Sequence, residues 1–135
     1  MNQPLSFRVE LSVPYEDALQ RVTTALKEEG FGVLTEIDVK ATMKEKLDED
    51  FRPYKILGTC NPPLAHRALS NEPQIGLMLP CNVTVEATDS GGSLVSIVNP
   101  EAMLGVGVLA DSDVVCSVAA EARTRLERVA EALRD

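Results

Sequence analysis

The chain has 135 residues, the usual size of one domain, with 44% hydrophobic and 25% charged residues. This composition predicts a single globular domain over 1–135 and excludes disordered and fibrous classes. The net charge of -8, from 21 acidic and 13 basic side chains, disfavours binding to nucleic acids and anionic membranes, because like charges repel.

The sequence also bounds the compartment. No apolar run approaches the roughly 20 residues that span a bilayer, and the first residues lack the basic flank and apolar stretch of a signal peptide. The three cysteines are an odd number, which does not suggest a disulfide framework. We therefore expect a cytoplasmic protein with free thiols.

The first half of the chain predicts two strands, each followed by a helix. Residues 5–13 alternate between apolar and polar, as in a strand with one wet face. Apolar residues at helical spacing predict a helix over 14–29 that ends at Gly30. Alternate apolar positions predict a second strand over 31–39. A mostly charged helix is expected over 39–49, with only a narrow apolar stripe to pack against the rest of the protein.

The second half begins with a predicted strand over 54–60 and a helix over 62–71 that Asn61 caps. Two strand-like runs, 77–89 and 93–99, flank the letters SGG and predict a hairpin. Pro80 interrupts the first of these runs, which favours an edge or a bulge there.

A last amphipathic helix is expected over about 112–134, after an apolar segment at 100–110 that two glycines punctuate. That segment is either a loop crossing the core or a contact surface. The order of elements predicts an α+β fold in which one mixed, mainly antiparallel curved sheet carries both long helices on the same face, with short helices in the connections.

Residues 57–69, LGTCNPPLAHRAL, bring a thiol, a double proline and the only histidine together. One interpretation is structural: Asn61 caps a helix and Cys60 is a small apolar residue. The other is chemical, because a thiol before a helix start faces unpaired backbone donors, which favours the thiolate. Cys81 belongs to a second Cys-Asn pair, and we expect Cys60, His66 and Cys81 to converge.

Convergence of these three side chains leaves two chemical alternatives open. Cys60, His66 and Cys81 would supply three ligands for zinc or copper, although their spacing is not a standard one. Alternatively, Cys60 would be an activated thiolate for redox or persulfide chemistry, with His66 as base and Cys81 as resolving thiol. Cys60, His66 and Cys81 are thus the candidate catalytic residues, and the sequence identifies no cofactor.

The stretch over 31–85 contains GFGVLTEIDV, KILGTCNP, HRAL and GLMLPCNV, and NPEAML follows it. In combination these motifs resemble the bacterial and archaeal family called domain of unknown function 302. The resemblance implies a strand-helix-four-strand-helix fold similar to that of the TATA-box-binding-protein class, and it implies no reaction. The shared residues of chemical character are Cys60, Asn61, Pro62, His66, Cys81 and Asn82.

A third interpretation is a non-enzymatic binding or assembly domain, and it is the one we favour. The sequence contains no phosphate loop, nucleophile elbow or metalloprotease motif. The open face of the sheet, with Asn61, Asn82 and a helix start, would hold a small ligand. Residues 103–110, MLGVGVLA, would be costly to expose in a monomer. We therefore also expect a homodimer.

Overall fold

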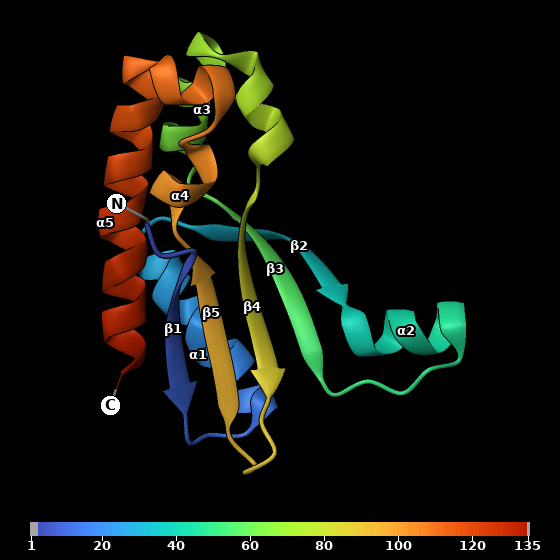
Figure 1. Cartoon of the computed structure of the whole chain (residues 1–135). Helices are drawn as coiled ribbons and strands as arrows, with labels where there is room; N and C mark the ends of the chain where they lie inside the picture. Colours follow the sequence, from blue (N-terminus) through green and yellow to red (C-terminus); the bar gives the residue numbers. More distant parts are fainter. Residues whose placement is uncertain (1–2, 135) are drawn as a thin grey trace.

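Five strands form one antiparallel sheet in the computed structural model, which describes residues 3–134 (Figure 1). They are β1 (Ser6–Leu11), β2 (Gly32–Asp38), β3 (Tyr54–Cys60), β4 (Cys81–Ala87) and β5 (Ser93–Val98). Their order across the sheet is β1-β5-β4-β3-β2, and each neighbouring pair runs antiparallel. The predicted hairpin around SGG is confirmed as the β4–β5 pair.

Helices cover one face of this sheet. The two long helices on this face are α1 (Tyr15–Glu28) and α5 (Asp113–Leu133). The connections contain α2 (Val39–Leu47), α3 (Pro62–Asn71), α4 (Pro100–Leu104) and the 3-10 helices η1 (Pro73–Met78) and η2 (Gly107–Asp111). The long helices α1 and α5 contact each other, while α1 packs on β4 and β5 and α5 packs on β1. The predicted α+β fold with both long helices on one face is confirmed.

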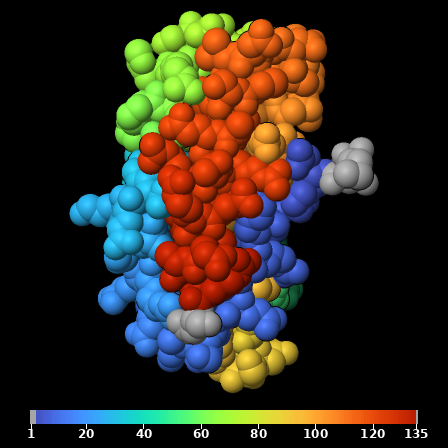
Figure 2. Space-filling model, turned by 90° about the vertical axis from the view of Figure 1, so that its left-hand side faces the viewer, coloured from blue at the N-terminus to red at the C-terminus, as the bar shows by residue number. Residues whose placement is uncertain are grey.

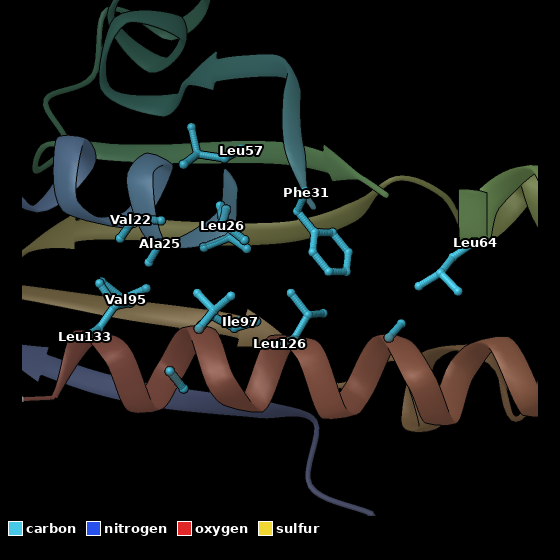
Figure 3. Close-up of a cluster of buried hydrophobic side chains, with 14 of the residues drawn as sticks. Val22, Ala25, Leu26, Phe31, Leu57, Leu64, Val95, Ile97, Leu126 and Leu133 are labelled. Carbon is cyan, nitrogen blue, oxygen red and sulfur yellow. The ribbon is translucent and has the colours of Figure 1, made fainter. Parts of the chain in front are cut away.

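The core lies between α1, α5 and the sheet. Val22 and Leu26 of α1, Ile97 of β5 and Leu126 of α5 are all 0% exposed. Figure 3 shows such side chains meeting between the two helices and the strands. Their burial follows from the sequence pattern, because the apolar residues of α1 and α5 recur at helical spacing and those of β5 alternate.

The helix α5 also fixes the end of α1. Figure 2 shows α5, in red, along the middle of one side of the molecule, with blue N-terminal segments on both sides. Arg128 Nη2 lies 2.9 Å from the Glu29 carboxylate, and Arg125 Nη1 donates a hydrogen bond of 3.2 Å to the Glu29 carbonyl. Glu29 is followed by Gly30, whose φ of 84° ends the helix. The turn into β2 is therefore held in place.

The helix α2 projects from the body of the molecule beyond β2 (Figure 1). None of its nine residues, all of which the structure describes, is buried. The helix is held locally, because the Asp38 side chain accepts a hydrogen bond of 3.0 Å from the Ala41 N–H and Asp48 adopts a left-handed cap with φ of 54°. Leu47, which belongs to the predicted narrow apolar stripe, is 64% exposed.

Two segments differ from the prediction. The run from 77 was expected to be strand, yet Met78 ends the 3-10 helix η1, and β4 begins only at Cys81. Pro80 directly precedes β4, so its missing N–H removes no ladder hydrogen bond. The apolar 100–110 segment is divided between α4 and η2, with Gly105 closing α4. None of the helices within residues 3–134 is long and apolar enough to cross a membrane.

Candidate functional site

A cavity of about 330 Å³ lies where one end of the sheet meets the shorter helices. Its walls come from α3, η1, α4 and α5, from the middle of β2, and from the neighbouring ends of β3 and β4. Ile75 and Leu104 are 1% and 3% exposed and form part of its interior. Volumes of this size are typical of small-molecule sites. We call this space the apolar cavity.

The mouth of the apolar cavity carries exposed leucines. Leu34 of β2 is 66% exposed, and Leu69 of α3 is 40% exposed. Leu34 occupies this position because the β2–β3 register shifts between Val33 and Thr35. The predicted alternation of 31–39 is therefore broken at Leu34, and its side chain reaches the cavity.

The start of α3 forms one wall, and Asn61 organises it. Its Oδ1 accepts a hydrogen bond of 3.3 Å from the Leu64 N–H, and its Nδ2 donates one of 3.4 Å to the Glu29 carbonyl. The predicted cap is confirmed, and Asn61 is 8% exposed. Because both ends of its amide have partners within the fold, Asn61 connects α1 to α3.

Cys60 and Cys81 both line the apolar cavity, so the structure brings these two predicted residues together. Cys60 is partly exposed at the end of β3, and Cys81 is buried at the start of β4. Thr59 Oγ1 donates a hydrogen bond of 2.8 Å to the Cys81 carbonyl, which locks the two strand ends together.

The chemistry of these thiols is the reverse of the predicted activation. Burial raises the pKa of Cys60, and burial together with the neighbouring Cys60 raises the pKa of Cys81 to about 11. A helix start lowers a thiol pKa through its unpaired N–H groups and the partial positive charge that they carry. Here Pro62 and Pro63 have no N–H, and the Leu64 N–H is used by Asn61. Both the raised pKa and the paired donors favour the neutral thiol and oppose the predicted activation of Cys60.

His66 does not join the cysteines. Its side chain is exposed and does not line the apolar cavity. Leu64 and Ala68 are the buried residues of α3, so a residue midway between them lies on the opposite side of the helix. The predicted convergence of all three residues is wrong for His66. Within residues 3–134 no group of three or more His, Cys, Asp or Glu side chains is arranged to hold a metal ion.

Asn82 lies elsewhere. It belongs to β4 but is exposed, and it lines a shallow groove of about 450 Å³ on the face of the sheet that carries no helices. Its neighbours there include Arg8, Thr84 and Ser96. Alternation along β4 places Asn82 and Cys81 on opposite faces. The two asparagines that were predicted to bind one ligand therefore belong to separate surfaces.

Gly58 of β3 is required for the close approach of two residues at the mouth. A Cβ at Gly58 would collide with Thr35 Oγ1 and would lie 2.8 Å from Pro80 Cγ. We expect Gly58→Ala to lower the free energy of unfolding by about 1–3 kcal/mol, as overpacking does. Gly32→Ala is the matched control, since a Cβ there meets nothing within 4 Å. Equal urea midpoints for the two variants would contradict the tight packing at Gly58.

Several residues of the apolar cavity were not predicted as functional. Ala65, Leu69, Ile75 and Val118 carry no chemically distinctive group, and their roles depend on which helices meet. The sequence contains one indication of the mouth of the apolar cavity: Val33 and Leu34 are consecutive apolar residues in an otherwise alternating strand. Such a pair is typical of a strand irregularity.

These features define the class of protein: an α+β domain whose antiparallel sheet has one face covered by helices, with an apolar cavity at one end. The chain belongs to the family Domain of unknown function DUF302, whose model matches residues 7–133.

A solved structure of a second member has the same fold. It is described as the crystal structure of an uncharacterized conserved protein DUF302 from Bacillus stearothermophilus, with 28% sequence identity and a TM-score of 0.85. The similarity covers 98% of this chain and 100% of that chain. No curated protein matches the sequence.

Proposed function

We propose that this protein is a non-enzymatic binding domain that holds a small apolar ligand in the apolar cavity. The observation that supports this proposal most strongly is the cavity itself, which has a volume of about 330 Å³ and is lined mainly by aliphatic side chains from four helices and three strands. A largely apolar, preformed concavity is the usual form of a small-molecule site.

The exposed leucines at the mouth support this function. Leu34 and Leu69 are 66% and 40% exposed beside the interior of the cavity. Removing apolar surface from water contributes about 25 cal/mol per Å². A ligand that fills the cavity and contacts these side chains would therefore gain binding free energy from both, without any new hydrogen bond.

The chemical alternatives have less support. Thiol redox chemistry needs an accessible thiolate, but burial raises the pKa of both Cys60 and Cys81. Zinc or copper binding by three residues would need His66 beside the thiols, and His66 is outside the cavity. The paired thiols are better explained as soft, weakly polar parts of an apolar wall.

The uncharged fluorophore N-phenyl-1-naphthylamine tests the proposal. We expect its emission to rise on binding to the wild type and to stay low with Ala65→Trp, because Ala65 is partly exposed on the cavity wall and indole would fill the space. Ala120→Trp is the control, since Ala120 is exposed on α5 and does not line the cavity. Equal binding by both variants would contradict the site.

The three free thiols provide a second, residue-specific measurement. Because burial raises the pKa of Cys60, we expect its alkylation by iodoacetamide to be slower at pH 8 than that of the exposed Cys116, and to accelerate only at higher pH. Peptide mass spectrometry reports each site separately. Faster labelling of Cys60 than of Cys116 at pH 8 would instead support the hypothesis that Cys60 is an activated thiolate.

Self-association is a second proposal, and we retain the homodimer. Val106 and Val108 are 49% and 54% exposed, whereas Leu104 and Leu109 of the same apolar segment are 3% and 4% exposed. The segment therefore belongs partly to the core, and its two valines are the candidates for a contact between copies. Light scattering that gives a monomer mass at all concentrations would remove this proposal.

We further propose that the protein works in the cytoplasm without nucleic-acid partners. Cys60, Cys81 and Cys116 are all free thiols, as expected in a reducing compartment. The net charge of -8 opposes approach to a phosphate backbone. Retention of the protein on heparin or DNA resin at physiological salt would contradict the second expectation.

A further inference from the structure

The wall of the apolar cavity carries no charge. Among the described residues that line it, every side chain is aliphatic, a thiol, a hydroxyl or an amide. The two thiols stay protonated at neutral pH, because burial raises their pKa values. An anionic ligand would therefore meet no cation inside the cavity.

The buried polar side chains on the wall, Thr59 and Asn61, are already used by the fold, whereas Thr35 is exposed. Thr59 Oγ1 donates to the Cys81 carbonyl, and Asn61 uses its oxygen for the Leu64 N–H and its nitrogen for the Glu29 carbonyl. Within residues 3–134 no buried side-chain nitrogen or oxygen lacks a hydrogen-bond partner. A polar ligand group that reaches the buried part of the wall would thus have to compete with existing hydrogen bonds.

The start of α3 is closed to anions as well. The first turn of a helix ordinarily binds anions through its free N–H groups. In α3 the first two residues are Pro62 and Pro63, which have no N–H, and the next two N–H groups bond to Asn61 Oδ1 at 3.3 Å and to the Asn61 carbonyl at 2.9 Å. No donor of this turn is left to bind a carboxylate or a phosphate.

We infer that the apolar cavity selects uncharged apolar molecules and rejects carboxylates of the same chain length. This inference rests on the proposed binding function and narrows its ligand class. Transferring a carboxylate into a site without a cation or free donor is strongly unfavourable. We expect the neutral member of a matched pair to bind at least about 100-fold more tightly than the acid, the factor that about 2.8 kcal/mol corresponds to.

The matched pair 1-octanol and octanoate tests this at pH 8.5, where octanoate is fully ionised. The readout is protection of Cys60 from N-ethylmaleimide, with the exposed Cys116 as internal reference. We expect octanol to slow labelling of Cys60 alone, and octanoate to need at least about 100-fold higher concentration for the same effect. Equal protection by octanoate would overturn the selectivity while leaving the binding function intact.

The two failures can be told apart. If octanol gives no protection and N-phenyl-1-naphthylamine does not bind, then the proposed function itself is wrong.

A cation at the mouth supplies the complementary test: Leu34→Lys should allow octanoate to protect Cys60, because Leu34 is 66% exposed and a lysine is tolerated there. Leu47→Lys on the projecting helix α2, 64% exposed, should leave octanoate excluded. If octanoate protects Cys60 no better in Leu34→Lys than in the wild type, the electrostatic basis of the selectivity is contradicted.

Discussion

Replacement of Leu126 by alanine is expected to lower the free energy of unfolding by about 2–5 kcal/mol. Leu126 is 0% exposed, and it lies where α5 meets α1 and the sheet (Figure 3). Its removal leaves a void that neighbours on three elements cannot fill, because each is fixed by its own backbone hydrogen bonds. Urea denaturation followed by circular dichroism measures the loss.

The control for this variant is Leu47→Ala, which deletes the same atoms from a side chain that is 64% exposed on α2. We expect its effect to stay within about 0.5 kcal/mol, as for surface substitutions. Similar losses at the two positions would mean that α2 contributes to the core, or that α5 does not pack on the sheet as described.

A second pair of variants separates the core from the contact surface in the apolar segment. Leu104→Asp places a carboxylate at a position that is 3% exposed, so we expect a loss of more than about 4 kcal/mol and a largely unfolded chain. Val106→Asp changes a residue that is 49% exposed. We expect it to stay folded and to shift the proposed dimer to a monomer.

Circular dichroism and light scattering on both variants distinguish the outcomes. A folded Leu104→Asp would show that α4 does not close the cavity as the structure describes. A folded Val106→Asp with an unchanged dimer mass would place the contact between copies elsewhere. If Val106→Asp unfolds as readily as Leu104→Asp, the whole segment belongs to the core.

Much of the fold follows from local sequence patterns. Period-two and helical spacing identified β1, α1 and α5, and the Asn-Pro-Pro sequence identified the start of α3 at Pro62. The prediction of a strand from residue 77 was wrong because the letters LML have the apolar character of a strand, while the proline that follows is compatible with several conformations. Its 3-10 conformation depends on packing against α3 and α4, which local sequence does not encode.

The candidate site was harder to predict, for two physical reasons. The double proline at 62–63 predicts a helix start, but it also removes two backbone donors beside Cys60, and that loss opposes activation of the thiol. Helix geometry predicts His66 near the start of α3 and so near the cysteines, although the burial of Leu64 and Ala68 on the same side of α3 turns residue 66 to solvent. Ligand chemistry was therefore expected where the fold forms an apolar cavity.

The most direct test of the central claim is a methyl NMR titration of the wild-type protein with 1-octanol. We predict saturable shifts for the methyl groups of Leu69, Ile75 and Val118, which line the apolar cavity, and constant positions for Leu5 and Val98 on the open face of the sheet. Shifts confined to Leu5 and Val98, or no saturable shift in the cavity at any soluble concentration, would contradict the account.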